Sequence, residues 1–254
     1  MLAGGGSRRM GAAKATLDWH GAPLVRRVAG LLGRVAGTVV VVGAPGQELP
    51  PMPGVLLAVD ETPGRGPLEG IAAGLRTLDG RCAAIFVAAT DLPFLHPAFV
   101  LAVADALGGS GAAVPELAGR LHPLAGAYGA SALPLVDRLL AGGERRATAL
   151  PEHADTAVLA AEGLPHPESL RNVNSRRDYE EALREPEPAV RVDGTVYRAA
   201  TLGRLLHRVQ LAPGSALALG GARLGDDLGF PLADGDELSA VPAGQVPARR
   251  PSST

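Results

Sequence analysis

The 254-residue sequence is poor in several residue types that would identify particular classes of protein. Its single cysteine, Cys82, cannot form an internal disulfide, which favours a reducing compartment. Its formal net charge of −2 lacks the positive excess that binds a nucleic-acid backbone or an anionic membrane. No apolar run reaches the roughly 18–20 residues of a membrane span, and no signal-peptide pattern follows Met1. We therefore predict a cytoplasmic protein without nucleic-acid or membrane partners.

Two further scarcities draw attention to individual residues. Lys14 is the only lysine among 24 basic residues, and the only asparagines are Asn172 and Asn174. A GC-rich genome explains the general bias, and it makes the positions that retain these residues candidates for function. Apolar residues make up 46% of the sequence, which is close to the usual globular composition and enough to build a core.

Helical and strand patterns alternate along the first three quarters of the chain. Apolar residues at helical spacing predict helices within residues 24–35, 68–78 and 99–107. Short continuous apolar runs, typical of strands buried on both faces, occupy residues 38–42, 55–59 and 83–88. Strands that alternate with helices are joined by right-handed crossovers. We predict an α/β fold for residues 1–184, a three-layer sandwich with a mostly parallel sheet.

The pattern changes after residues 184–188, whose sequence REPEP is typical of a linker. An Asp193-Gly194 turn between two short apolar segments predicts a hairpin, followed by a helix and further short strands. We predict a small β-grasp-like domain over residues 189–244 and a disordered tail over residues 245–254. Few contacts should cross the linker.

The glycine-rich segment of residues 2–14 is the most informative stretch of the sequence. Its exposed backbone N–H groups could wrap phosphate oxygens without obstruction by side chains. It is not a Walker A loop, because Ala12 stands where lysine is required, nor a dinucleotide fingerprint, because Arg9 replaces the third glycine. The alternative is a glycine-rich terminus without function.

Five motifs occur in order between residue 2 and residue 174. They are Leu2–Gly5 with Arg9-Met10-Gly11 and Lys14, Gly66–Gly70 with Asp60 before it, Ala88–Leu95, Arg120–Leu124, and Arg171–Asn174. Together they resemble the signatures of the molybdenum cofactor guanylyltransferase family, within the nucleotidyltransferase superfamily. The resemblance implies a Rossmann-like fold and the transfer of GMP from GTP to the phosphate of molybdopterin, with Mg²⁺ as cofactor.

The resemblance also assigns roles to individual residues. It implies that Lys14, Asp91 and Arg9 are catalytic and that Asp91 holds the metal. It implies that the nucleotide is bound by Leu2, Ala3, Gly4, Gly5, Lys14, Asp60 and Asp91. These roles are physically consistent, since a lysine is a compact cation for a triphosphate and Asp91 follows a predicted buried strand, where α/β sheets bind ligands. The alternatives are a surface lysine, a helix-capping Asp91 and a solvated Asp60.

The acceptor side is implied at His122, Asn172 and Asn174. The two asparagines stand two residues apart and would face the same side of an extended segment, where amides can read the edge of a pterin. Local turn chemistry for the asparagines and a structural role for His122 are the alternatives. Residues 144–146 could anchor an acceptor phosphate or form a solvated face. We expect Cys82 to be part of the core.

The sequence departs from the family pattern at several positions. The family has an apolar strand before the glycine loop, where this sequence has only Met1; we expect exposed edges on the neighbouring strands and an unanchored loop. An upstream start or a truncated sequence would explain the difference. Gly43 and Ala13 replace an asparagine and an aspartate of the family, whereas Gly5 favours guanine over cytosine. A cytidylyl- or sugar-phosphate transferase and a non-catalytic cofactor-binding or scaffold protein are the alternatives.

The C-terminal module resembles the ubiquitin-like sulfur carriers of molybdopterin synthesis, chiefly through residues 232–238. Those carriers act through a free Gly-Gly end, whereas this chain continues past Gly244-Gln245 to Thr254. We expect carrier chemistry to be lost and residues 189–254 to be dispensable for the reaction. We expect a docking role for the module, toward other molybdenum cofactor biosynthesis proteins or molybdoenzymes, or a vestigial one.

Overall fold

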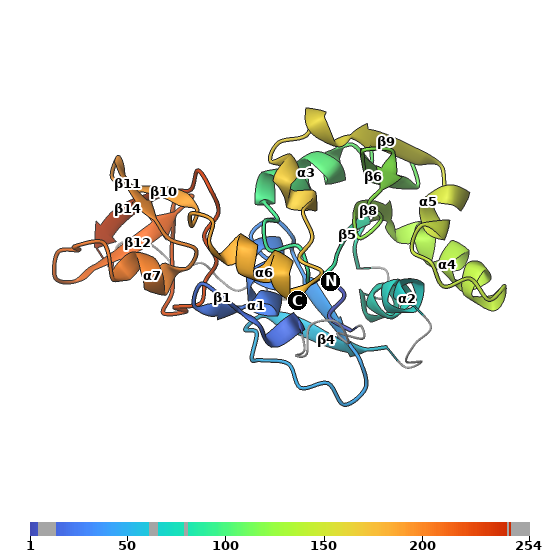
Figure 1. Ribbon diagram of the computed structural model, residues 1–254, viewed down its shortest axis with the longest axis horizontal. Helices are drawn as coiled ribbons and strands as arrows, with labels where there is room; N and C mark the ends of the chain where they lie inside the picture. Colours follow the sequence, from blue (N-terminus) through green and yellow to red (C-terminus); the bar gives the residue numbers. More distant parts are fainter. Residues whose placement is uncertain (5–13, 61–65, 79–80, 243, 245–254) are drawn as a thin grey trace.

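The computed structural model describes residues 1–4, 14–60, 66–78, 81–242 and 244. Two groups of elements are visible in Figure 1, one formed by residues before α6 (Arg176–Leu183) and one by residues after it. The predictions for Gly5, Arg9, Ala13 and the tail of residues 245–254 lie outside the described residues. Within the described part, no helix has the length and apolarity that crossing a membrane requires.

The N-terminal module contains a mixed β-structure. β3 (Val39–Gly43) pairs in parallel with β4 (Val55–Val59), and β6 (Ala112–Leu117) pairs in parallel with β9 (Thr156–Ala160). β8 (Ala125–Gly129) lies between β5 (Ala84–Ala88) and β6 and runs antiparallel to both. The short β7 (Arg120–Leu121) forms a hairpin with β6. The α/β prediction is therefore confirmed, but the predicted mostly parallel sheet is wrong: the pairing is mixed, because β8 runs antiparallel between β5 and β6 and the sequence patterns did not indicate it.

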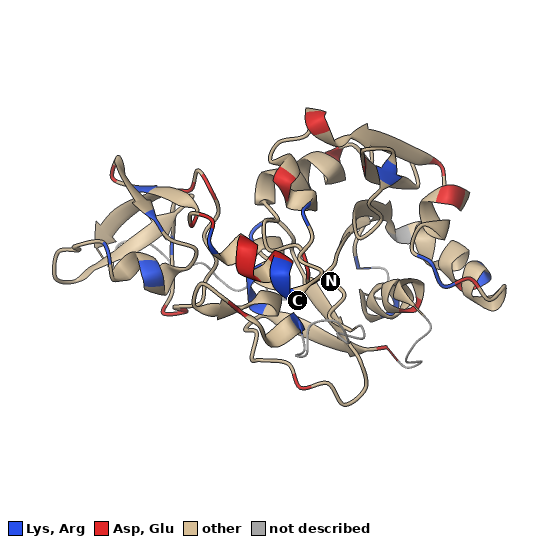
Figure 2. Cartoon of the chain, viewed as in Figure 1, with Lys and Arg blue, Asp and Glu red and all other residues tan. Residues whose placement is uncertain are grey.

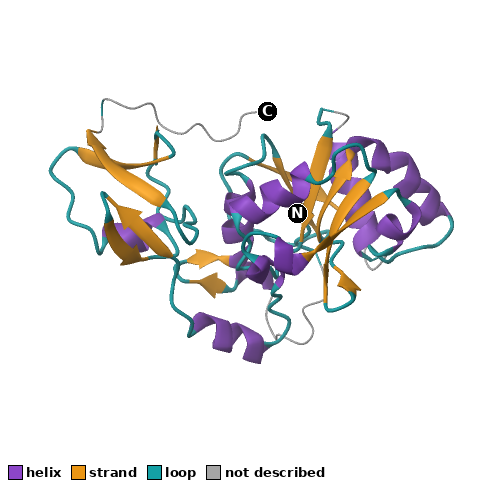
Figure 3. Ribbon diagram, turned by 90° about the horizontal axis from the view of Figure 1, so that it is seen from above, coloured by secondary structure: helices purple, strands orange, loops and turns teal. Residues whose placement is uncertain are grey.

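Helices cover both sides of these strands, which gives the three layers (Figure 3). α1 (Leu24–Leu32) and α3 (Pro97–Asp105) contribute to one apolar cluster together with β3. α2 (Pro67–Leu78), α4 (Leu133–Ala141) and α5 (Ala149–His153) contribute to a second cluster, together with Val87 and Tyr128. The helix and strand predictions before residue 108 agree with these elements to within a few residues.

Leu2 joins the two parts of the sheet. It forms parallel bridges to Val42 of β3 and to Ala89 beyond β5, and its amide donates to the Ala88 carbonyl at 2.8 Å. The Met1 amino group donates to the Val40 carbonyl at 2.8 Å. Residues 1–3 are thus anchored on both strands, whereas residues 5–13 of the loop that we expected to be unanchored lie outside the described residues.

The expectation of exposed strand edges is confirmed at the amino end of β5 but not for β3, whose residues are all buried. A cavity of about 440 Å³ lies there, lined by Met1, Val40, Phe86 and neighbouring apolar residues. Ala84, at the start of β5, is exposed. Cys82 also lines this cavity and is half-buried ahead of β5, so its predicted place in the core is wrong.

Strand β4 also differs from its prediction. Leu57 and Val59 are 62% and 52% exposed, whereas every residue of β3 is buried. β4 lies at the edge of the sheet beside β3, and only one of its faces is covered. An apolar run alone does not distinguish a central strand from such an edge strand.

The C-terminal module forms a five-stranded sheet. Its order is β11-β10-β14-β12-β13, in which β10 pairs in parallel with β14 and the other pairs are antiparallel. The strands are β10 (Ala189–Val192), β11 (Thr195–Arg198), β12 (Ser215–Leu219), β13 (Ala222–Arg223) and β14 (Glu237–Pro242). α7 (Leu202–Leu206) packs into their apolar cluster. Asp193 and Gly194 have φ of 47° and 84°, as the predicted hairpin turn requires.

The segment before this module is more than a linker. Glu187 is 9% exposed and binds Arg204 of α7 at 2.7 Å and Arg208 at 2.8 Å. Contacts also cross to the C-terminal module from α1 and from the residues just after it, among them ion pairs of Arg26 with Asp227 and of Arg34 with Asp236. The prediction that few contacts cross this boundary is therefore wrong.

Candidate active site

Four of the predicted site residues lie together although they come from three distant segments. Lys14 Nζ lies 3.3 Å from Asp91 Oδ2 and donates a hydrogen bond to Asn174 Oδ1 at 3.1 Å. Asn172 Nδ2 donates to Asp91 Oδ1 at 3.1 Å. Lys14 begins the short helix η1 (Lys14–Thr16), Asp91 follows β5, and the asparagines precede α6. We name Lys14, Asp91, Asn172 and Asn174 the polar cluster.

The turn after β5 fixes the position of Asp91. The Thr90 hydroxyl and amide both donate to the Leu2 carbonyl, at 2.8 and 3.1 Å. The Asp91 carbonyl accepts a hydrogen bond from the Val173 amide at 2.9 Å. The Asp91 side chain is 18% exposed and that of Lys14 22%, so a ligand can reach both groups. Thr90 was not predicted, although it is the residue that ties this turn to the N-terminal segment.

The two asparagines flank a buried residue, as their spacing predicts. Val173 is 1% exposed and packs in a cluster with Trp19, Leu24 and Tyr179, whereas both asparagines are exposed. The alternative was that the asparagines form local turns ahead of the following helix. The start of that helix is instead fixed by Ser175, which is its N-cap and forms a capping box with Asp178. The Asn172 and Asn174 side chains are directed to the polar cluster instead.

The N-terminal segment borders the cluster through its backbone. The Ala3 amide donates to the Val42 carbonyl at 2.8 Å, and the Ala3 carbonyl accepts from Gln47 Nε2 at 3.0 Å. A Cβ on Gly4 would lie 3.2 Å from the Ala44 nitrogen, so only glycine fits there without displacement. The contribution of Gln47 could not be predicted, since its partners are backbone groups.

Asp60 and His122 do not belong to the polar cluster. Asp60 follows β4, and its amide donates to the Gly43 carbonyl at 2.9 Å. β3 and the Leu2 segment separate β4 from β5, so Asp60 lies about 14 Å from the end of β5 at strand spacings of about 4.8 Å. His122 lies in the turn between β7 and β8, where burial, and secondly Arg120, lower its pKa.

Residues 144–146 form a local turn that supports the helix α2. Glu144 accepts hydrogen bonds from the Arg145 and Arg146 amides, and its bonds to Arg146 lower its pKa to about 2. The Arg145 carbonyl accepts from the Leu68 amide at 3.4 Å and would lie 2.5 Å from a Cβ on Gly66. Of the two alternatives, this arrangement favours the solvated face over a phosphate anchor.

A divalent metal fits the polar cluster only in a particular way. Among the described residues, no three His, Cys, Asp or Glu side chains gather into a metal site. Mg²⁺, however, is commonly held by one or two carboxylates together with substrate phosphates and water. The accessible Asp91 carboxylate suits that mode of binding, in which the substrate completes the coordination.

The chain is similar to known proteins over its N-terminal part. A family model described as "MobA-like NTP transferase domain" matches residues 1–163. A protein of Mycobacterium tuberculosis named "Probable molybdenum cofactor guanylyltransferase" is 39% identical over 180 residues, which cover 69% of this chain and 87% of that protein. A protein of the same name from Mycobacterium avium is 36% identical over 182 residues, with coverages of 70% and 90%.

Solved structures share the fold. Molybdopterin-guanine dinucleotide biosynthesis protein A from Archaeoglobus fulgidus superposes with a TM-score of 0.57 at 23% identity and covers 71% of this chain and 94% of its own. A 2-C-methyl-D-erythritol 4-phosphate cytidylyltransferase from Thermus thermophilus reaches 0.55 at 21% identity, with coverages of 72% and 95%. The fold is thus common to enzymes named for different nucleotides.

Proposed function

The chain belongs to the MobA-like NTP transferase family, and from this premise we propose that it transfers GMP from GTP to the phosphate of molybdopterin. An oxygen of the acceptor phosphate attacks the α-phosphorus of GTP, and the bond from that phosphorus to the pyrophosphate oxygen breaks. Pyrophosphate leaves, and molybdopterin guanine dinucleotide is formed. The attacking oxygen already carries negative charge, so no general base is needed.

The polar cluster carries this proposal. Lys14 binds triphosphate oxygens as a compact cation and stabilises the charge that develops on the leaving pyrophosphate. Asn172 orients the Asp91 carboxylate through a hydrogen bond. The two asparagine amides stand on the same exposed side and are available to the pterin acceptor. Holding both substrates in line supplies much of the catalysis in such a reaction.

Asp91 is the residue that would hold Mg²⁺. When bound, the ion neutralises charge on the phosphate oxygens. Asp60 lies too far along the sheet edge to share that ion and is proposed as a nucleotide contact instead. His122 remains a proposed acceptor contact, because the Leu124 carbonyl of its turn accepts from the Ala89 amide, two residues before Asp91.

The C-terminal module is proposed to be β-grasp-like. Its order of strands, the parallel pairing of its first and last strands and its single described helix after the first hairpin support this. A docking role toward other molybdenum cofactor biosynthesis proteins or molybdoenzymes is part of the proposal. Because the proposed substrate is GTP, we place the reaction in the cytoplasm.

Substrate preference tests the proposal against a cytidylyl or sugar-phosphate transferase. With molybdopterin and Mg²⁺ present, we expect the dinucleotide product from GTP and faster turnover than with CTP, ATP or UTP. Chromatography of the products measures this. Equal or faster turnover with CTP would contradict the choice of guanine, and binding of GTP without turnover would favour the non-catalytic scaffold.

A matched pair of variants tests the assignment of Asp91. Asp91→Asn removes the charge that would bind the metal and should abolish Mg²⁺-dependent turnover while the fold remains intact. Asp137→Asn removes a half-exposed carboxylate on α4 that pairs with Arg76 of α2, and it should retain turnover. Product formation and circular dichroism are measured for both. Normal turnover in Asp91→Asn would transfer the role to another carboxylate, with Asp60 next to be tested.

A further inference from the structure

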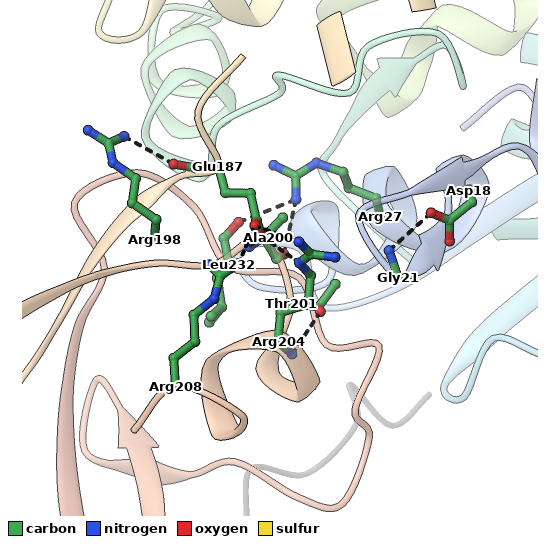
Figure 4. Close-up of polar contacts among 10 residues, drawn as sticks. All are labelled: Asp18, Gly21, Arg27, Glu187, Arg198, Ala200, Thr201, Arg204, Arg208 and Leu232. Carbon is green, nitrogen blue, oxygen red and sulfur yellow. Dashed lines mark hydrogen bonds and ion pairs between the residues drawn. The ribbon is translucent and has the colours of Figure 1, made fainter. Parts of the chain in front are cut away.

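Arg27 is a buried cation that connects the two modules. It lies on α1 with 5% of its surface exposed. Its Nε donates to the Pro93 carbonyl of the N-terminal module at 2.6 Å. Its Nη1 donates to the Ala200 and Leu232 carbonyls of the C-terminal module, at 3.2 and 3.4 Å (Figure 4).

The chemistry of this position requires arginine. Burial lowers the pKa of Arg27 to about 10, with a smaller contribution from Arg34, so the group stays charged at neutral pH. A buried cation is costly unless its donors are satisfied, and here backbone carbonyls accept from two different N–H groups of the planar guanidinium, Nε and Nη1. A lysine ammonium lacks the planar array of N–H groups that binds the Pro93 carbonyl and the Ala200 carbonyl at the same time.

The carbonyl that Arg27 binds belongs to the turn of Asp91. The Leu95 amide donates to the Leu92 carbonyl at 3.1 Å, which closes a turn with Pro93 at its second position. Thr90 fixes one end of this segment to Leu2, and Val173 fixes the Asp91 carbonyl. Arg27 holds the turn itself, so it fixes the segment that determines where the Asp91 carboxylate lies.

A second contact links the same segment to the C-terminal module. The His96 Nε2 lies 3.0 Å from the Asp234 carbonyl, and the His96 amide donates to Ser169 Oγ at 3.1 Å. Burial lowers the pKa of His96, which favours the neutral ring. The C-terminal module thus contacts the segment directly at His96 and through Arg27 at Pro93.

We propose that Arg27 is a positioning residue through which residues 189–242 hold the Asp91 turn in its active geometry. The proposal rests on the proposed function in that it takes Asp91 as a site residue. Attachment of the module to α1 does not by itself require Arg27, because Arg34 binds Asp236 through both Nη atoms and Arg26 binds Asp227. These ion pairs join α1 and the residues just after it to the module without passing through the turn.

Arg34 is the matched control for Arg27, because both contact the C-terminal module but only Arg27 also binds the Pro93 carbonyl. In the full chain, Arg27→Gln removes the bond to the turn, and Arg34→Gln removes a docking contact. We expect both variants to unfold at lower temperature. Only Arg27→Gln should lower kcat for GMP transfer, by about 10- to 100-fold, as expected for a catalytic group displaced by about 1 Å. Its KM for GTP should change by less than about threefold, since the Ala3 and Gly4 amides hold the N-terminal segment to Val42 of β3 without passing through the turn.

Hydrogen exchange gives a readout that does not depend on the reaction. The Val173 and Leu95 amides, which donate to the Asp91 and Leu92 carbonyls, should exchange faster in Arg27→Gln and at the normal rate in Arg34→Gln. If Arg27→Gln fails to fold, Arg27→Lys keeps the charge without the fork and is compared in the same way. Equal loss of kcat per folded molecule in the Arg27 and Arg34 variants, or unchanged exchange, would overturn the proposal. A wild-type protein without GMP transfer would refute the proposed function, and the exchange measurement would still decide the role of Arg27.

Discussion

At the scale of single residues, the polar cluster shows which side chains can be predicted from a sequence. Lys14 is the only lysine of the sequence, and Asn172 and Asn174 are its only asparagines. The structure brings all three together with Asp91. Their rarity in the sequence and the motifs that contain them indicated that they are site residues. Thr90, Gln47 and Arg27 bind backbone carbonyls of remote segments, and neither a motif nor a spacing encodes such partners. The roles of Gly5 and Arg9 stay predictions.

Substitution of Lys14 tests its proposed contact with the triphosphate. Lys14→Ala should weaken the binding of GTP in the presence of Mg²⁺ by about 10- to 100-fold, since one charge-assisted contact contributes about 1.5–3 kcal/mol. Lys14→Arg keeps the charge on a bulkier group and should lose less. Titration calorimetry measures both. Arg177→Ala removes an exposed cation on α6 and serves as the control; a Lys14→Ala affinity within twofold of that control would exclude the triphosphate contact.

At the scale of elements, strands were predicted well where apolar runs are long and poorly where small residues form the strand. β8 has the sequence AGAYG and carries no apolar run, yet it lies between β5 and β6. A Cβ on Gly126 would lie 3.1 Å from the Ala113 carbonyl, so the close approach of β6 explains the small residue. β4 was predicted as a strand but not as an edge strand, because the order in which strands pair is not visible in an apolar run.

The distribution of charge does not indicate where the elements lie either. Figure 2 shows basic and acidic residues interspersed over both modules of the described chain.

The cavity between β3 and β5 predicts the effect of added residues. Five apolar β-branched residues joined to the amino group of Met1 would enter a cavity of about 440 Å³ and pair with both strands. We expect the unfolding temperature to rise by about 5 °C or more, because buried aliphatic side chains contribute about 1.5–3 kcal/mol each before the cost of ordering them. A Gly/Ser extension of equal length is the control. Equal unfolding temperatures for the two extended chains would show that the cavity does not accept a strand.

The Met1 amino group predicts a dependence of stability on pH. Burial lowers its pKa from 8.0 to about 5, so the folded chain binds this proton only below about pH 5 and the unfolded chain binds it up to about pH 8. The unfolded state therefore holds more protons between these values, and the free energy of unfolding should rise with pH from about 5 to 8. The contribution is at most about 4 kcal/mol at 1.36 kcal/mol per pKa unit. Urea unfolding of the chain that begins at Met1 and of the apolar-extended chain, which lacks this amine, isolates the effect; parallel curves of stability against pH would contradict it.

At the scale of the whole molecule, the two modules are joined by polar contacts that composition conceals. The REPEP segment has the residues of a linker, yet Glu187 is buried and binds Arg204, Arg208 and the Ala200 amide. On α1, a Cβ at Gly30 would lie 2.7 Å from Pro231, so glycine permits the close approach of the C-terminal module. Sequence patterns indicate where a module begins. They do not indicate which surface of its neighbour it covers, because that depends on the partners of individual charges.

A chain that ends at Arg184 lacks the C-terminal module and tests its contribution to the reaction. From the sequence we expected full activity for this chain, because we expected few contacts across the boundary. The contacts that Arg27, Arg34 and His96 make with the C-terminal module lead us to expect lower activity instead. We predict that the shortened chain folds, as judged by circular dichroism, with a lower unfolding temperature and with kcat reduced about as far as in Arg27→Gln. Removing the module takes away two of the three acceptors of Arg27, so adding Arg27→Gln to the shortened chain should cause little further loss, the non-additivity expected of groups that act together. Full kcat per folded molecule in the shortened chain would show that the Asp91 turn holds its geometry without the module.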